Sequence, residues 1–325
     1  MIFFRLLIFF FFLFFFISCK KENPGFLSYN IYNVGENIPL KKIFFKDSIT
    51  CFTCGGFKNA QGAIFRSSDA AITWQKVFES SKYCINDLFF LDDSIGYACG
   101  DSLTLFKTSD SGRNWEQYFF PNLPWNQYMI PYNSIYVKSE TEIFLAGGEH
   151  YSKGCITHTL NGDGGWNHPS FDNEFNCLTF TDANTAYISG YGVIYKTSDG
   201  GNTFYPLTIR GDWYKSMFFF DNLTGFTAGY DGGLYKTTDG GTSWQTKISG
   251  NDAFGKRVHF NAVFFTDSNT GYIAASGGRL YKSADGGSSW HFSVINENEN
   301  LQSVCASSER KVYVCSDKGR VYEIK

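Results

Sequence analysis

The feature that most constrains the fold is a short motif that recurs along the chain. Five segments align without gaps, and each places an aspartate five residues before an aromatic residue. The segments are IFRSSDAAITW (64–74), LFKTSDSGRNW (105–115), IYKTSDGGNTF (194–204), LYKTTDGGTSW (234–244) and LYKSADGGSSW (280–290). A sixth copy, ITHTLNGDGGW (156–166), has asparagine in place of the aspartate, and a seventh begins at 321–325. Successive copies lie 38 to 51 residues apart, the length of a four-stranded propeller blade.

Four strands can be predicted within each repeat. In the copy that contains Asp239 they are Ser216–Phe220, Gly225–Gly229, Leu234–Thr237 and Trp244–Ile248. The first strands are nearly unbroken apolar runs, which suits strands buried on both faces. The third strands count to seven, and the last repeat lacks its fourth strand. The alternating segment 28–34 is expected to supply that strand and to close the ring. We therefore predict an all-β fold, a single seven-bladed β-propeller over residues 28–325.

The N-terminal segment resembles an export signal. Arg5 is followed by an apolar run over residues 6–17, which is too short for a membrane-spanning helix and typical of a secretory signal. The signal ends in Ser18-Cys19, which resembles the lipobox of bacterial lipoproteins and predicts a signal peptide at 1–18, acylation of Cys19 and a tether at 19–27. The expected location is the cell envelope, with a lipid anchor in the outer membrane. An ordinary secretory signal is the alternative.

The repeated motif resembles the Asp box, or bacterial neuraminidase repeat, in the form found in the photosystem II assembly and stability factor-like propellers. In such a motif the aspartate accepts backbone N–H groups of its turn and the aromatic residue fills the space between sheets. We expect that structural role for the motif residues Asp69 and Trp74, Asp110 and Trp115, Asn161 and Trp166, Asp199 and Phe204, Asp239 and Trp244, and Asp285 and Trp290. The resemblance implies an assembly role and a protein partner.

Composition and residue spacing exclude several other classes of function. With 28 Lys and Arg against 31 Asp and Glu, the chain lacks the basic excess of a nucleic-acid-binding protein. His150, His158 and His168 lack the spacing of metal ligands, and we predict no metal, no cofactor and no catalytic residue. The eight cysteines besides Cys19 are expected to lie in an oxidising compartment, where disulfides can form. Cys305 and Cys315 are expected to be either a disulfide pair or free thiols.

Binding residues are predicted on the face formed by the loops that join blades and by the turns between second and third strands, because loop length varies there. Aromatic residues at these tips either contact a partner or pack onto the sheets. Arg279 and Arg320 occupy one column in adjacent blades, as the remnant of the arginine patch that the resemblance implies. The candidate contact residues are Trp125, Tyr128, Tyr132, Glu149, His150, Tyr151, Arg279 and Arg320.

Two functions from different classes stay open. One is a non-catalytic, membrane-anchored propeller that binds a protein or a surface polymer such as a glycan. The other is a glycoside hydrolase, either sialidase-like or xyloglucanase-like, since such enzymes also carry Asp boxes. Hydrolysis needs two carboxylates across a cleft, for which the candidates are Glu140, Glu142, Glu149 and Asp252.

Overall fold

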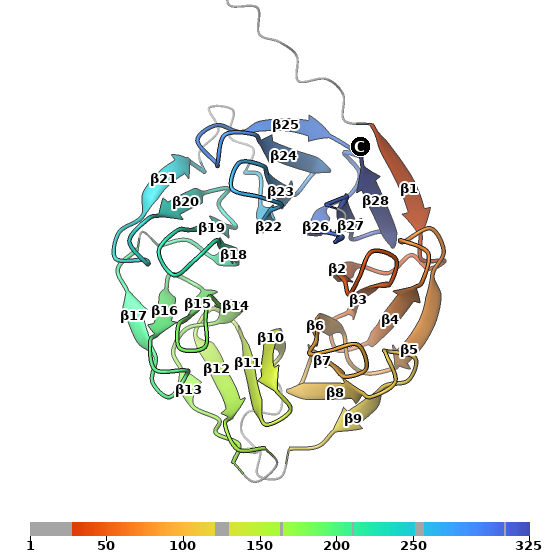
Figure 1. Cartoon of the computed structure of the whole chain (residues 1–325), viewed down its shortest axis with the longest axis horizontal. Coiled ribbons are helices and arrows are strands. Elements are labelled where there is room, and N and C mark those ends of the chain that lie inside the picture. The colour runs from red at the N-terminus through yellow and green to blue at the C-terminus, as the bar shows by residue number, and fades with distance from the viewer. Residues whose placement is uncertain (1–27, 121–129, 163–164, 210, 251–256, 309) are drawn as a thin grey trace, which may run out of the picture.

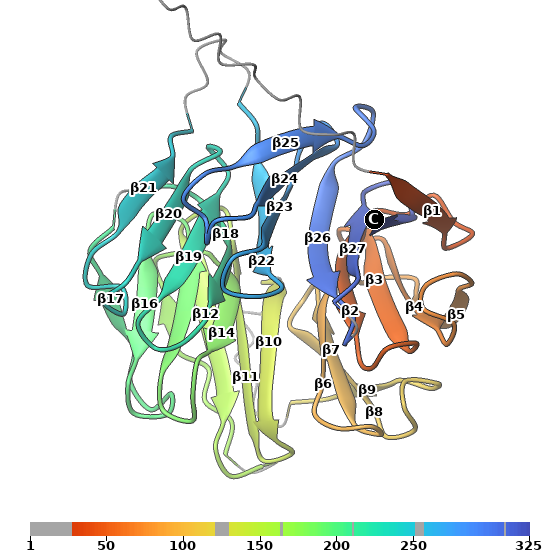
Figure 2. The same cartoon turned by 45° about the horizontal axis from the view of Figure 1, so that its top comes forward.

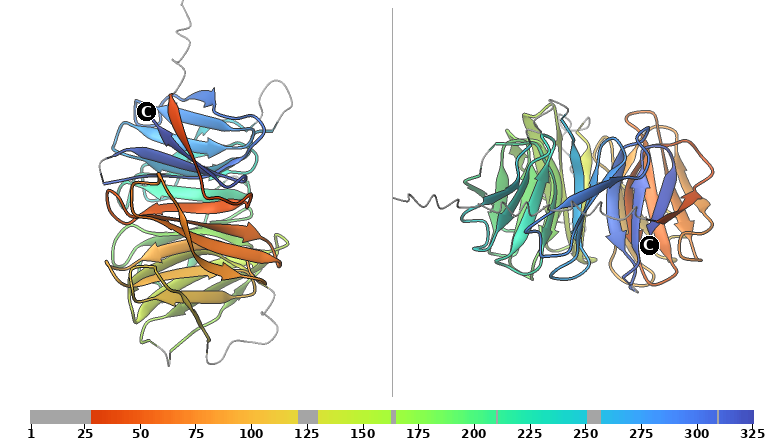
Figure 3. Two further views of the ribbon diagram at one scale, coloured as in Figure 1. Left: turned by 90° about the vertical axis from the view of Figure 1, so that its right-hand side faces the viewer. Right: turned by 90° about the horizontal axis from the view of Figure 1, so that it is seen from above.

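The structure is a computed structural model that describes residues 28–120, 130–162, 165–209, 211–250, 257–308 and 310–325. These residues form seven antiparallel four-stranded sheets arranged as blades around a central channel, which confirms the predicted seven-bladed propeller (Figure 1). Edge-on, the ring is a thick disc (Figure 3). In the described part of the chain no helix is long and apolar enough to cross a membrane.

Six blades take their strands in chain order from the channel outward. Blade 1 consists of β2 (Leu40–Phe45), β3 (Cys51–Phe57), β4 (Gln61–Ser67) and β5 (Gln75–Ser80). Blade 2 consists of β6 (Ile85–Phe90), β7 (Gly96–Gly100), β8 (Thr104–Thr108) and β9 (Glu116–Tyr118). Blade 3 consists of β10 (Tyr132–Ser139), β11 (Glu142–Glu149), β12 (Lys153–Thr159) and β13 (Ser170–Phe171).

The next three blades have the same plan. Blade 4 consists of β14 (Phe175–Phe180), β15 (Ala186–Gly190), β16 (Ile194–Thr197) and β17 (Tyr205–Leu207). Blade 5 consists of β18 (Tyr214–Phe219), β19 (Gly225–Gly229), β20 (Leu234–Thr237) and β21 (Gln245–Ile248). Blade 6 consists of β22 (Phe260–Phe265), β23 (Gly271–Ala275), β24 (Arg279–Ser283) and β25 (His291–Val294).

Blade 7 joins the two ends of the described chain. Its strands are β26 (Leu301–Ala306), β27 (Val312–Ser316), β28 (Arg320–Ile324) and β1 (Tyr29–Asn33). β1 pairs antiparallel with β28, with Ile31 opposite Tyr322, and lies on its outer side (Figures 1 and 2). The Tyr29 hydroxyl also donates to the Ile295 carbonyl of blade 6 at 3.0 Å. The predicted closure by the N-terminal segment is therefore confirmed.

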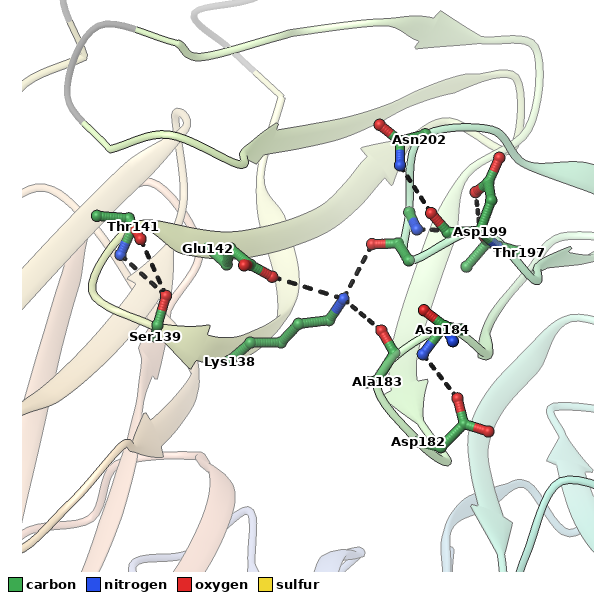
Figure 4. A network of polar contacts seen from close by, with 12 residues as sticks. Lys138, Ser139, Thr141, Glu142, Asp182, Ala183, Asn184, Thr197, Asp199 and Asn202 are labelled. Carbon is green, nitrogen blue, oxygen red and sulfur yellow. Dashed lines mark hydrogen bonds and ion pairs between the residues drawn. The ribbon is translucent and has the colours of Figure 1, made fainter.

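Basic side chains fasten several blades to the next blade. Lys138 of β10 donates to the carbonyls of Ala183 (2.8 Å) and Gly200 (2.9 Å) in blade 4, and its ammonium lies 4.4 Å from the centre of the Phe180 ring (Figure 4). Lys196 reaches the Gly240 carbonyl of blade 5 at 2.9 Å in the same way. Lys236 of β20 reaches the Gly286 carbonyl of blade 6 at 3.1 Å, so Lys196 and Lys236, which both follow the tyrosine of a third strand, hold neighbouring blades together.

Candidate binding site at the channel mouth

The Asp-box carboxylates are occupied within their own turns, at the end of the blades away from the blade-joining loops. Asp199 accepts the Thr197 hydroxyl at 2.7 Å, the Thr203 N–H at 3.0 Å and the Thr203 hydroxyl at 2.6 Å. Bonds from the Asn114 N–H and amide hold the pKa of Asp110 down at about 2. The Ser289 hydroxyl and N–H do the same for Asp285. Such carboxylates stabilise turns and leave little capacity for a ligand.

The motif aromatics pack between the blades, and the sixth box departs from the pattern. Trp115 is buried against Phe90, with ring centres 5.9 Å apart. Trp166 of the sixth copy stays in the packing and donates to the Tyr118 hydroxyl at 3.0 Å. There the Thr159 hydroxyl donates to the Gly162 carbonyl instead of to a carboxylate. The other motif aromatics, Trp74, Phe204, Trp244 and Trp290, lie against the hydrophobic clusters of the blades.

A β-bulge at the start of the first strand of every blade builds the channel mouth. In blade 3, Tyr132 pairs with Gly147 and Ser134 pairs with Ala146, which leaves Asn133 as the extra residue. Gly147 is required opposite the bulge because a Cβ there would lie 1.9 Å from the Pro131 carbonyl oxygen. The residue before each bulge is buried, so the bulged residue lines the channel instead. We call these seven residues the mouth ring: Lys41, Asn86, Asn133, Asn176, Lys215, Asn261 and Gln302.

The asparagines of the mouth ring are held in place by the neighbouring blade. The Asn86 amide donates to the Tyr132 carbonyl at 3.0 Å, and the Asn176 amide donates to the Tyr214 carbonyl at 3.1 Å. Asn133 and Asn261 make the equivalent bonds at 2.8 Å. Asn86 and Asn261 each keep a second amide proton and the amide oxygen for a ligand. Asn133 donates its second proton to the Gly148 carbonyl at 3.3 Å, and the Asn176 oxygen accepts from Lys215. The ring borders two hollows of about 390 and 360 Å³.

Aromatic side chains form a continuous belt on the same face, across blades 3 to 6. We call Tyr151, Tyr191, Trp213, Tyr230 and His259 the aromatic belt. Tyr151 lies 4.7 Å from Tyr191 and 5.1 Å from Trp213 between ring centres. Trp213 lies 5.2 Å from Tyr230, which stacks on His259 at 3.7 Å. The three tyrosines are 37% to 49% exposed, so the belt presents apolar ring area to a partner.

Charged groups lie where the belt meets the mouth ring. The Lys215 ammonium is 3.1 Å from the centre of the Trp213 ring and 3.3 Å from the Asn176 amide oxygen. Burial lowers the pKa of Lys215 to about 7, with Glu174 opposing and Lys41 adding to that shift. Glu174 accepts the N–H of Tyr151 at 3.1 Å, and burial raises the pKa of its carboxyl. That bond fixes Tyr151, whose φ of 65° is in the left-handed region.

The predicted contact residues do not form a single surface in the structure. Tyr151 lies in the aromatic belt, and Glu149 lies beside it, 2.9 Å from Lys58 and 3.5 Å from His150. Tyr132 is instead a core residue, with its ring fully buried and its hydroxyl donating to Thr157 at 2.8 Å, so the expectation of a surface contact is wrong for it. Trp125, Tyr128 and Cys19 lie outside the described residues.

The two candidate arginines line hollows at the blade 6 and blade 7 side of the same face, apart from the aromatic belt. Arg279 lies over Phe292, 5.0 Å from its ring centre, and Arg320 forms an ion pair with the buried Glu299. Both side chains are therefore already engaged within the propeller.

The three candidate carboxylates for hydrolysis that the structure describes do not assemble into a pair across the channel. Glu140 and Glu142 lie at the turn between β10 and β11, where they contact Lys107 and Lys138. Glu149 ends β11 and so lies at the other end of the channel, and Asp252 is outside the described residues. No cluster of three potential metal ligands occurs within the described ranges. Their eight cysteines are free, and Cys305 pairs across the hairpin with Tyr313 rather than with Cys315.

Reading the repeats as columns could have found the residues that sequence reasoning missed. The mouth-ring position follows the first buried residue of each blade, and it holds an amide in five of seven copies. Trp213 and Tyr230 flank strands β18 and β19 of blade 5 and His259 precedes β22 of blade 6, and the residue types at these loop positions differ from blade to blade, so the repeat pattern does not mark them.

Comparisons with known proteins agree with this architecture. Residues 66–211 match the family model described as photosynthesis system II assembly factor YCF48. A solved structure of YCF48 bound to D1 peptide is 17% identical, with a TM-score of 0.70 over 91% of this chain and 94% of that one. YCF48 from Cyanidioschyzon merolae is 16% identical, with a TM-score of 0.70 over 91% and 98% of the two chains.

A glycosidase shares the fold as well. The GH74 xyloglucanase from Xanthomonas campestris is 12% identical, with a TM-score of 0.67 over 90% of this chain but only 53% of its own. A search of curated proteins gives no significant match. At these identities the solved structures establish the fold. Together with the family match over residues 66–211 they confirm the resemblance given by the repeats: the chain is a β-propeller similar to the photosystem II assembly factor YCF48.

Proposed function

We propose that this protein is a membrane-anchored, non-catalytic propeller that binds a segment of a protein partner on its channel-mouth face, in an assembly or scaffold role. The observation that carries the proposal is the aromatic belt, in which five rings from four blades contact one another beside the channel. Rigid aromatic side chains supply much contact area at low entropic cost and dominate many protein interfaces.

The surroundings of the belt suit a peptide. The remaining amide protons and oxygens of Asn86 and Asn261, which line the same hollow as Trp213, supply donors and acceptors for a partner's backbone. The family likeness supports the proposal, because one YCF48 structure of the same fold holds a D1 peptide.

Anchoring is proposed from the sequence. Acylation at Cys19, followed by the tether 19–27, would hold the propeller at the outer membrane in the cell envelope. Cys19→Ser should then move the protein from the membrane fraction to the soluble fraction and abolish palmitate labelling. Equal fractionation of the variant and the native protein would contradict the anchor.

Retention of envelope proteins on the immobilised protein tests the binding face. The test variant is Tyr151→Ser/Tyr230→Ser, which removes two exposed rings of the belt. The control is Tyr205→Ser, because Tyr205 is 43% exposed on the outer strand β17. We expect a partner that is retained by the native protein and the control and lost by the double variant. Equal retention by all three proteins would place the interaction elsewhere.

A further inference from the structure

We infer that the channel mouth holds a specific carboxylate site between Lys41 and Lys215. The inference goes beyond the proposed partner, since the carboxylate could belong to a free small acid or to the end of a peptide. The charged side chains around the mouth ring are unequally paired.

Most other cations near the ring have a carboxylate partner. Lys42 bonds Asp87 at 3.0 Å, and Lys58 bonds Glu149 at 2.9 Å. Within the described ranges, neither Lys41 nor Lys215 forms an ion pair. Glu174, the acidic neighbour of Lys215, uses its carboxylate on the Tyr151 N–H instead. The mouth therefore has positive charge that its own side chains leave unpaired.

The two lysines occupy equivalent bulge positions in blades 1 and 5 and line the same two hollows. Asparagine amides of the mouth ring lie between them along the rim. The remaining N–H groups of Asn86 and Asn176 can donate to an oxygen bound by the ammonium groups, whereas both amide protons of Asn133 are already used. The amide oxygens would repel a more highly charged phosphate, and the ring lacks the arginine forks that suit phosphate. A single planar carboxylate fits this donor set best.

The same hollows hold other titratable groups that face Lys215. These are Lys41, Lys58, Asp101, Glu149, His150, Glu174 and His259. Since the pKa of Lys215 is about 7, its charge is full at pH 6 and mostly lost at pH 8. Carboxylate binding should therefore weaken as the pH rises through this range. Lys215→Arg keeps a charge at both values and should remove most of the pH dependence.

Nuclear magnetic resonance of the Trp213 indole N–H tests the site, because Lys215 lies over that ring. The probes are succinate, acetyl-dialanine with a free carboxylate, the same peptide as an amide, and inorganic phosphate. Lys41→Gln and Lys215→Gln should each weaken binding of the acidic probes roughly tenfold, the value of one charge-assisted hydrogen bond. Lys58→Gln is the matched control, since Lys58 is already paired with Glu149.

We expect shifts of the indole signal with at least one acid probe and none with the amide. Shifts with succinate alone identify a small-acid site, and shifts with the free-acid peptide alone identify a peptide-end site. Equal shifts with the amide or with phosphate, or an equal loss in Lys58→Gln, would overturn the inference. The absence of a shift with either acid would overturn it as well. The proposed function is tested separately, and loss of partner retention in the belt variant would leave it standing even then.

Discussion

The second glycine of the blade 4 Asp box, Gly201, allows a sharp test of how the blades are held together. Gly201 has φ of 98°, and a Cβ added there would lie 2.3 Å from Cε1 of Phe144 in blade 3. Phe144 is fully buried, so its ring cannot move without disturbing β11 and its neighbours. Gly200 in the same turn has φ of 79°, but a Cβ there meets nothing closer than 3.7 Å. Alanine substitutions at Gly200 and Gly201 therefore separate the cost of backbone strain from the cost of a packing clash.

The magnitudes follow from these contacts. Gly200→Ala should cost only the left-handed penalty of about 1 kcal/mol in the free energy of unfolding. Gly201→Ala should cost that amount plus about 1 to 3 kcal/mol for overpacking a core. Blade 1 shows that the backbone tolerates alanine, because Ala70 and Ala71 occupy the equivalent positions with φ of 58° and 69°. The excess in Gly201→Ala therefore measures contact with Phe144.

Urea unfolding of the native protein and the two variants gives the difference directly. We expect Gly201→Ala to unfold at lower urea than Gly200→Ala, and Gly201→Ala/Phe144→Leu to recover part of the loss. Equal midpoints for the two alanine variants would refute the idea that Asp-box turns pack on the preceding blade. A loss in Gly200→Ala larger than in Gly201→Ala would refute it as well.

Three further predictions follow from the fold. Deletion of residues 1–33 removes β1 and bares the edge of β28, so size-exclusion chromatography with light scattering should show more oligomer or aggregate than a protein of residues 20–325, which keeps β1; equal mass distributions for the two would contradict closure by β1. The depressed pKa values of Asp110 and Asp285 mean that their stabilisation is present above about pH 4 and lost as the pH falls toward 2. Thermal unfolding across that range should show a steeper fall for the native protein than for Asp110→Asn/Asp285→Asn, and parallel curves would be inconsistent with the turn bonds. Alkylation in denaturant should label Cys305 and Cys315 without prior reduction, and a disulfide-linked peptide in the mass spectrum would contradict their separation.

The sequence predicted the blades because each repeat carries its own local signals. Alternation in 28–34 and the Asp-box spacing depend on residues near one another in the chain, and β1, β19 and β20 lie where those patterns put them. The mouth could not be predicted as readily, because it is formed by single residues from seven blades. Tyr132 illustrates the limit: it follows an aromatic-rich loop segment, yet it is the buried residue before a bulge, and Asn133 is the one that faces the channel.

The channel-mouth binding face is the central claim, and site-specific photocrosslinking in intact cells tests it most directly. A photoreactive phenylalanine analogue replaces Tyr230 in one variant and Tyr205 in another, since both positions are partly exposed but lie on the mouth and on the outer strand β17 respectively. We predict a discrete partner adduct from position 230 and none from position 205. An adduct from position 205 alone, or equal adducts from both positions, would contradict the claim.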